Sequence, residues 1–299
     1  MSKIIEVSNL SKNFGSLKAL DKVSFAIEQD GINGLVGRNG AGKTTLLEIL
    51  TSQTIASEGE VTILGQHPFE NSYVMSNIAF IKEAQRYPDN ILPKVKDVLG
   101  AAALLFENWD QGFADQLLVD FRLDLKRKVR KLSKGQTAAL GVVIGLASRA
   151  PITIFDEPYS GMDPVARQLF YDRLLADYSE NPRTIIFSTH LVDEAADLLE
   201  HIIVLESGRV ILDAATEDLR GQAAVIEGPM AKVMEAIEKL EVLELQEVGS
   251  FGRAFVNQIS HSQSSKFVSE GLNVQPISLQ QLIISKTKQN SSIEMESAK

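Results

Sequence analysis

The run Gly37-Arg38-Asn39-Gly40-Ala41-Gly42-Lys43-Thr44 combines the residue types that a bound polyphosphate requires. Glycine lets phosphate oxygens approach backbone N–H groups closely, because it has no side chain and accepts positive φ angles. An apolar run precedes this loop and a helical pattern follows it, so the free N–H groups at the helix start favour an anion. Lys43 supplies a positive charge for the β- and γ-phosphates, and Thr44 supplies a hydroxyl for Mg²⁺. The residues predicted to contact ATP are Gly37, Asn39, Gly40, Ala41, Gly42, Lys43, Thr44 and Thr45.

A pair of carboxylates, Asp156 and Glu157, follows the apolar run at 152–155. Ligands of open α/β sheets bind beyond the carboxyl ends of the strands, where both carboxylates are expected. We predict that Asp156 holds Mg²⁺ and that Glu157 polarises an attacking water as a general base. A surface turn before Pro158 explains the pair equally well by itself, and the phosphate loop upstream favours the functional interpretation.

A third motif, Leu132-Ser133-Lys134-Gly135-Gln136, precedes a predicted helix. The Ser133 hydroxyl and the Gly135 amide at such a helix start are groups that bind an anion. The same pattern is also an ordinary helix cap, and the residues alone favour the cap.

Apolar runs alternate with helical patterns along most of the chain, which predicts an α/β fold with a mostly parallel sheet covered by helices. A helical segment at about 84–149 interrupts the alternation like an inserted subdomain. We assign residues 1–220 to the ATP-binding domain and residues 221–287 to a small α+β domain without a chemical motif. The polar residues 288–299 are expected to form a flexible tail.

Composition and charge limit the classes of partner. The chain has 299 residues, a formal net charge of -9 and no cysteine. The acidic balance argues against a nucleic acid as ligand, and the lack of cysteine excludes disulfides and thiolate chemistry. The N-terminal residues lack the apolar core of a signal peptide, and no apolar run is long enough for a transmembrane helix. We therefore expect any role at a membrane to go through a partner.

The order and spacing of these motifs resemble the nucleotide-binding subunit of an ATP-binding-cassette (ABC) transporter. Lys43 lies in the equivalent of the Walker A loop, residues 132–136 are similar to the signature motif, and Asp156-Glu157 resembles the end of Walker B. The resemblance covers about residues 3–220 and rests on the motifs as a set.

Other positions match the same family. Residues 160–163 are similar to the D-loop, so Asp163 is expected to order the subunit interface. His190 falls where the family's switch histidine lies, which implies that it touches the γ-phosphate and holds the water or Glu157 in place. Phe14 occupies the place of the aromatic residue that stacks on adenine.

The resemblance implies a P-loop NTPase cassette with a mostly parallel core sheet, an antiparallel β subdomain and an inserted helical subdomain. It also implies that two subunits pair head to tail, with each ATP between one subunit's phosphate loop and the other's signature motif. Ser133 and Gly135 then contact the γ-phosphate across the interface, and Gln136 belongs to the same nucleotide-binding set. The second subunit is either identical or a paralogue.

Three positions depart from the family pattern. Lys134 stands where the signature usually has glycine, and Thr137 stands where a basic residue is common. The family also places a glutamine after the strand at 78–82, where this chain has Glu83, with Gln85 two residues later. We assign the position to Glu83, whose carboxylate is then a candidate to reach Mg²⁺ or the attacking water.

The C-terminal addition and the segment containing Asn108-Trp109-Asp110 resemble bacterial exporter subunits, in the subgroup linked to antibiotic or peptide export and envelope stress. The resemblance implies a separate transmembrane permease that docks on about 84–112, which places the chain at the cytoplasmic face of the membrane through that permease. Phe106 and Trp109 are candidates for this contact, and core packing explains them equally well. The alternative is a soluble cassette ATPase not tied to transport, for example in iron–sulfur assembly.

Overall fold

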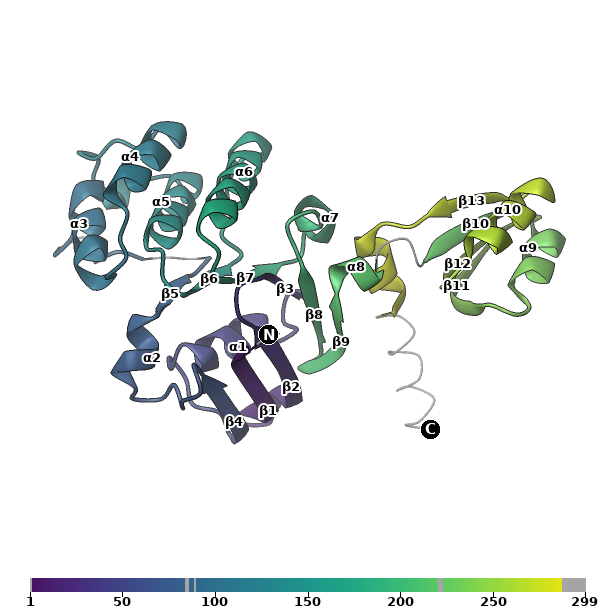
Figure 1. Cartoon of the computed structure of the whole chain (residues 1–299), viewed down its shortest axis with the longest axis horizontal. Coiled ribbons are helices and arrows are strands. Elements are labelled where there is room, and N and C mark those ends of the chain that lie inside the picture. Colours follow the sequence, from purple (N-terminus) through teal and green to yellow (C-terminus); the bar gives the residue numbers. More distant parts are fainter. Residues whose placement is uncertain (1, 84–85, 89, 220–222, 287–299) are drawn as a thin grey trace. The chain divides into compact units, whose positions relative to one another are not determined.

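The computed structural model describes residues 2–83, 86–88, 90–219 and 223–286 (Figure 1). The chain divides into two compact units, Met1–His190 with Leu198–Asp213 and Leu191–Asp197 with Ala214–Lys299. This division falls a few residues before position 221, where the sequence places the domain boundary. The predicted tail at 288–299 lies outside the described residues.

The first unit is built around a six-stranded sheet with the strand order β5-β6-β7-β3-β8-β9 (Figure 1). Its strands are β3 (Ile32–Val36), β5 (Ile78–Ile81), β6 (Ile152–Asp156), β7 (Thr184–Thr189), β8 (His201–Glu206) and β9 (Arg209–Ala215). Neighbouring strands from β5 to β8 are parallel. Every residue of β3, β6 and β7 is buried, as expected for parallel strands covered on both faces. The predicted mostly parallel core sheet is confirmed.

An antiparallel sheet of order β2-β1-β4 completes this core. Its strands are β1 (Lys3–Phe14), β2 (Leu17–Glu28) and β4 (Glu58–Ile63), and the short helix α2 (Ser72–Ser76) lies between β4 and β5 along the chain. Helix α1 (Lys43–Leu50) begins directly after the phosphate loop, and its Leu46 and Leu47 are fully buried. These leucines belong to one cluster with Ile5 of the antiparallel sheet and Ile186 of the parallel sheet. Packing on both sides thus fixes where α1 starts.

The segment between β5 and β6 is helical, as predicted. It contains α3 (Val95–Leu105), α4 (Gln111–Asp120), the 3₁₀ turn Val129–Lys131 and α5 (Lys134–Ala147). Helix α5 packs on β5 and β6, and glycine makes the approach close, since a Cβ on Gly145 would lie 2.5 Å from a ring carbon of Phe155. The sheet therefore fixes the position of α5 and of the motif at its N-terminus.

The second unit has the order of elements β10-α9-β11-β12-α10-β13, and its antiparallel sheet has the strand order β11-β12-β10-β13. This is the split βαβ arrangement found in ferredoxin-like folds. The elements are β10 (Ala224–Pro229), α9 (Met230–Ile237), β11 (Glu241–Val248), β12 (Phe251–Asn257), α10 (His261–Ser269) and β13 (Asn273–Pro276). The short helices α7 (Val192–Ala195) and α8 (Thr216–Leu219) and the helical residues 279–286 also belong to this unit.

A buried charge cluster ties α6 (Pro164–Glu180) to the segment before β7. The Asp177 carboxylate contacts Arg183 Nη1 at 2.8 Å and Arg149 Nη2 at 3.3 Å. Asp177 and Arg183 are each only 5% exposed. A charge removed from water in this way is tolerated because it is paired.

We expect Asp177→Ala to lower the free energy of unfolding by about 3–5 kcal/mol, because it leaves the buried Arg183 without its main counterion. Chemical denaturation of the purified chain measures this. The matched control is Asp172→Ala on the exposed side of the same helix, whose side chain accepts a hydrogen bond from Gln168, with an expected change within about 0.5 kcal/mol. Equal effects of the two substitutions would show that the cluster does not hold α6.

Candidate functional site

The phosphate loop connects β3 to α1 and adopts the backbone that its glycines allow. Gly40 has φ 83° and Gly42 has φ 107°. A Cβ on Gly42 would lie 2.7 Å from the carbonyl oxygen of Ala19, so no other residue fits there without moving the loop. Residues 38–40 and Thr44 are exposed, and the rim of the loop is therefore open to a ligand.

Lys43 lies folded over its own loop. Its Nζ donates to the carbonyl oxygens of Gly37 at 2.6 Å and Arg38 at 3.4 Å, and it lies 3.4 Å from Glu157 Oε1. The residue is only 6% exposed. A buried ammonium group with carbonyl and carboxylate partners is a charge that phosphate oxygens can engage in their place.

Thr44 and Asp156 meet at the carboxyl edge of the parallel sheet. Thr44 Oγ1 donates to Asp156 Oδ2 at 3.0 Å, and Ser188 Oγ donates to Asp156 Oδ1 at 2.6 Å. Burial raises the pKa of Asp156, against the opposing effect of these two hydrogen bonds.

A hydroxyl and a carboxylate side by side are hard oxygen donors of the kind that Mg²⁺ prefers. No group of three or more His, Asp or Glu side chains in the described residues is placed to hold a metal. Mg²⁺ commonly needs no such group, because substrate phosphates and water complete its coordination. Thr44 and Asp156 therefore fit Mg²⁺ bound together with a nucleotide.

Glu157 is held in a strained backbone conformation beside Lys43. Its φ is 48°, a region that residues other than glycine rarely adopt and that clusters at functional sites. Its N–H donates to Ser188 Oγ at 3.0 Å, and its Oε2 lies 2.8 Å from His190 Nδ1. The structure thus brings Glu157, His190 and Lys43 together, as the sequence predicts.

Ser188, Tyr159 and Thr189 are not among the residues predicted from the sequence. Ser188 and Tyr159 contact the carboxylates of Asp156 and Glu157, and Thr189 contacts the Tyr159 hydroxyl. β6 and β7 pair in parallel with Asp156 opposite Ser188, so the polar end of β7 lies beside the acidic end of β6. The Tyr159 hydroxyl donates to Glu157 Oε2 at 2.5 Å and lies 2.8 Å from Thr189 Oγ1. The signal available in the sequence was the polar ending of an otherwise apolar strand at the ligand-binding edge.

The motif at 132–136 lies at the N-terminus of α5. Ser133 Oγ accepts from the Gln136 N–H at 3.2 Å, and Gln136 Oε1 accepts from the Ser133 N–H at 3.1 Å, which is a capping box. Gly135 is in close contact with the next loop, since a Cβ there would lie 2.5 Å from the carbonyl oxygen of Gly161. Among the described residues, no hydrogen bond or ion pair joins this motif to the phosphate loop of the same chain.

Glu83 contacts a different set of residues from Thr44 and Asp156. Its Oε1 accepts from Ser160 Oγ at 2.7 Å and lies 3.6 Å from Lys134 Nζ. Glu83 therefore connects the loop after β5 to the α5 motif and to the loop after β6. Its role toward Mg²⁺ stays a prediction, and Gln85 lies outside the described residues.

Phe14 and Asp163 lie at the end of a strand and at the start of a helix, respectively. Phe14 ends β1 with its ring 49% exposed, and Lys12 Nζ lies 4.9 Å from the ring centroid. An exposed ring is available for stacking on a base. Asp163 Oδ1 accepts from the Ala166 N–H at 2.9 Å and so caps α6.

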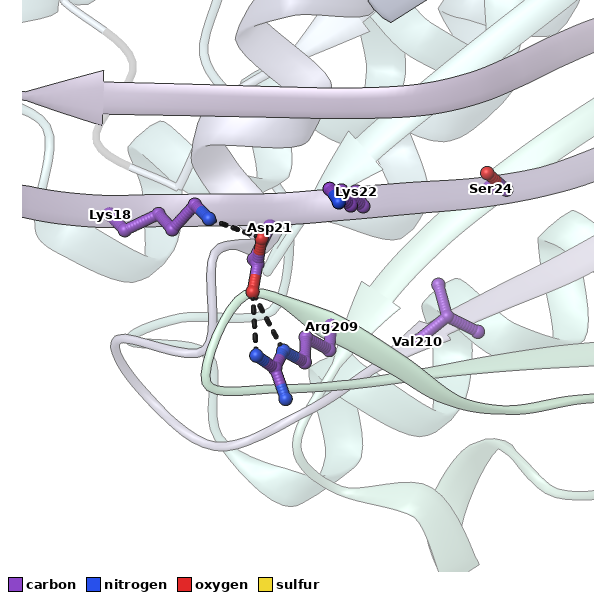
Figure 2. Close-up of a pocket in the computed structure, with 6 residues that line it drawn as sticks. All are labelled: Lys18, Asp21, Lys22, Ser24, Arg209 and Val210. Atoms are coloured by element: carbon purple, nitrogen blue, oxygen red, sulfur yellow. Dashed lines mark hydrogen bonds and ion pairs between the residues drawn. The ribbon is translucent and has the colours of Figure 1, made fainter. Parts of the chain in front are cut away.

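A second charged cluster supports the phosphate loop from β2 and β9. Figure 2 shows the Asp21 carboxylate between Lys18 and Arg209, which contact it at 2.5 Å and at 2.7–2.8 Å. Hydrogen bonds from these two cations lower the pKa of Asp21. The Asp21 N–H donates to Gly208 O at 2.8 Å, and the Gly208 N–H donates to Ala41 O at 3.0 Å. The β8–β9 turn is thereby fastened to the loop that receives the phosphates.

Several known proteins are similar to this chain in sequence. The family model described as ABC transporter matches residues 20–160. YcbN of Bacillus subtilis (strain 168), an uncharacterized ABC transporter ATP-binding protein, is 30% identical over 74% of this chain and 73% of its own length. The bacitracin transport ATP-binding protein BcrA of Bacillus licheniformis is 27% identical over 74% of this chain and 72% of its own. The tungstate uptake ATP-binding protein TupC of Peptoclostridium acidaminophilum is 32% identical over 69% of this chain and 96% of its own.

Solved structures show the same fold. A structure described as the ATP binding subunit of an ABC transporter superposes with a TM-score of 0.65 and 24% identity, over 72% of this chain and 91% of that one. The predicted α/β cassette fold is thus confirmed.

We expect Gly42→Ala to weaken ATP binding by roughly tenfold or more, because a strained backbone residue costs about 1–3 kcal/mol and the new Cβ meets Ala19. Fluorescence anisotropy of a labelled ATP analogue measures the affinity. Gly249→Ala is the control, since Gly249 also has positive φ but no atom within 4 Å of its added Cβ. Unchanged affinity in Gly42→Ala would mean that the loop does not bind phosphate in the conformation described.

Proposed function

We propose that this chain, which belongs to the ABC transporter family as an ATP-binding subunit, hydrolyses ATP at a site completed by a second copy of itself. The hydrolysis drives export through a separate membrane subunit. The observation that carries the proposal is the meeting of Lys43, Thr44, Asp156, Glu157 and His190 at one edge of the sheet. Together they supply the charge, metal and base sites that phosphoryl transfer to water requires.

Glu157 is the general base of the proposed reaction. A water attacks the γ-phosphorus, its proton passes to the Glu157 carboxylate, and the bond between the γ-phosphorus and the bridging oxygen breaks, leaving ADP and phosphate. Lys43 stabilises the negative charge on the phosphate oxygens, and it already lies 3.4 Å from Glu157. Thr44 and Asp156 would hold Mg²⁺, which would supply further neutralisation of the phosphate charge. His190, 2.8 Å from Glu157 Oε2, orients the carboxylate.

The second copy contributes the start of its α5. Ser133 is exposed, and its hydroxyl caps the helix by accepting from the Gln136 N–H. The helix N-terminus combines free N–H groups with the positive end of the helix dipole, which suits a γ-phosphate. Because this chain carries both the phosphate loop and this motif, two identical copies complete two sites. Gln136 and Asp163 lie beside the same surface in the proposed dimer, and Phe14 stacks on adenine.

Coupling to a membrane is proposed through a partner. No helix in the part of the chain that the structure describes is long and apolar enough to cross a bilayer. Helix α3 in the predicted docking segment ends in Leu104 and Leu105, which are 90% and 73% exposed. Apolar side chains exposed in sequence at a helix end favour a protein contact. We propose that a transmembrane permease covers them, and that Phe106 and Trp109 support this surface. The chain then lies at the cytoplasmic face of the membrane.

Export of peptides, antibiotics or envelope-active compounds is the proposed direction. The similarity to the bacitracin transport protein BcrA supports it, whereas the tungstate uptake protein TupC represents the competing direction. The names of these relatives favour transport over a soluble role such as iron–sulfur assembly. The experiment that distinguishes the two directions is to purify the chain from its native membrane and identify any membrane protein bound to it.

We expect Glu157→Gln to bind ATP with the affinity of the unchanged chain and to hydrolyse it at least about 100-fold more slowly, because the base is lost and the shape is kept. Phosphate release measures turnover, and size-exclusion chromatography with ATP shows an accumulated dimer. Wild-type turnover in this variant would remove Glu157 from the role of base.

Ser133→Arg tests the shared site. Its bulk at the exposed helix start blocks the second subunit, so we expect ATP-dependent dimerisation to disappear while the isolated chain binds ATP within about twofold of wild type, since surface changes rarely alter a fold. Analytical ultracentrifugation in the presence of ATP measures the fraction of dimer. Ser179→Arg, at an exposed position of α6, is the control that retains it. A dimer that persists in Ser133→Arg would contradict the assignment of the α5 motif.

A further inference from the structure

Tyr159 is a buried hydroxyl-bearing residue that the reaction described above does not use. The residue is 3% exposed. Its hydroxyl lies 2.5 Å from Glu157 Oε2 and 2.8 Å from Thr189 Oγ1, and it accepts from the His190 N–H at 3.3 Å. One phenol oxygen thus contacts both the acidic end of β6 and the polar end of β7.

The direction of each hydrogen bond follows from what each group can donate. An ionised carboxylate only accepts, so the one hydroxyl hydrogen of Tyr159 goes to Glu157. The Tyr159 oxygen then accepts from the Thr189 hydroxyl and from the His190 N–H. By the same reasoning the hydrogen between His190 Nδ1 and Glu157 Oε2 lies on Nδ1. Two donors therefore converge on Oε2.

The other carboxylate oxygen of Glu157, Oε1, is the one that can act on an attacking water. Oε1 is buried and has no hydrogen-bond partner among the described residues, and it lies 3.4 Å from Lys43 Nζ. The Lys43 ammonium compensates the charge of Oε1 by an ion pair, and the oxygen can still accept a hydrogen bond from a ligand or water. Oε1, on the Lys43 side, is therefore the oxygen available to an attacking water.

Tyr159 is well placed to keep this arrangement fixed. Its buried ring packs against Phe187 of β7, with centroids 5.9 Å apart, and this packing restricts the motion of the hydroxyl. Burial, together with the neighbouring Glu157, raises the pKa of Tyr159 well above its usual range. The hydroxyl therefore keeps its proton and remains a donor.

We propose that Tyr159 is a positioning residue for hydrolysis: its hydroxyl fixes the rotation of the Glu157 carboxylate so that Oε1 receives the proton of the attacking water. This inference rests on the proposed role of Glu157 as general base. Tyr159 acts on the rate of the chemical step through Glu157 and makes no contribution to holding ATP.

The test is Tyr159→Phe in the full-length chain, which removes the hydroxyl and keeps the ring. We expect kcat for ATP hydrolysis to fall by about 10- to 100-fold, the scale of misplacing a reacting group, with KM and ATP affinity unchanged. Tyr171→Phe is the matched control, since Tyr171 is 4% exposed and packs against the same Phe187; its kcat should equal that of wild type. Thr189→Val, which removes the hydroxyl behind Tyr159, should lower kcat by a smaller factor.

Combination with Glu157→Gln separates a positioning role from a structural one. If Tyr159 acts through the carboxylate, Tyr159→Phe added to Glu157→Gln should slow hydrolysis no further, because interacting residues are non-additive. A further loss in the double variant, wild-type kcat in Tyr159→Phe, or a fall of ATP affinity and Tm in step with kcat would each overturn the inference. Wild-type turnover in Glu157→Gln alone would instead overturn the proposed base, so the two failures are distinguishable.

Discussion

The parallel pairing of β6 with β7 is the constraint on which the whole site depends. Its register places Asp156 opposite Ser188, so the residues that follow on each strand must meet as well. Glu157 thereby reaches His190, and its N–H reaches Ser188 Oγ. β3 pairs with the other side of β7, which brings the phosphate loop and Lys43 to the same edge. A shift by one residue would turn these side chains to the other face of the sheet.

In the proposed mechanism, a single chain supplies only part of each ATP site. The phosphate loop, Thr44, Asp156 and Glu157 lie together, while the N-terminus of α5 presents Ser133 at a separate exposed surface. The close contact of Gly135 with Gly161 places that surface beside the loop after β6. In the proposed dimer, ATP lies between the phosphate loop of one copy and the α5 motif of the other. Hydrolysis of ATP is therefore expected to separate the two copies.

The sequence predicted the parts of this site that a local pattern encodes. A glycine loop between a strand and a helix, and an acidic strand end, are local features, and the structure has both. The hydrogen bonds of Tyr159 and Thr189 depend on which strands become neighbours. No single segment of the sequence predicts such a pairing between distant strands. Helix α10 was not predicted from the sequence. It is mostly polar and buries only Phe267, so it lacks the apolar periodicity by which a helix is recognised. The contacts of Glu83 with Ser160 and Lys134 likewise arise only when the loops after β5 and β6 come together.

The shared nucleotide site is tested most directly by cross-linking between two differently substituted copies. The chain has no cysteine, so Asn39→Cys in one preparation and Ser133→Cys in another introduce the only thiols. The two are mixed with a short thiol-specific cross-linker, with and without a non-hydrolysable ATP analogue. A head-to-tail site predicts a covalent dimer that contains one copy of each variant and forms only with the analogue. Cross-linking within either variant alone, equal cross-linking without nucleotide, or none in the mixture with nucleotide would contradict it.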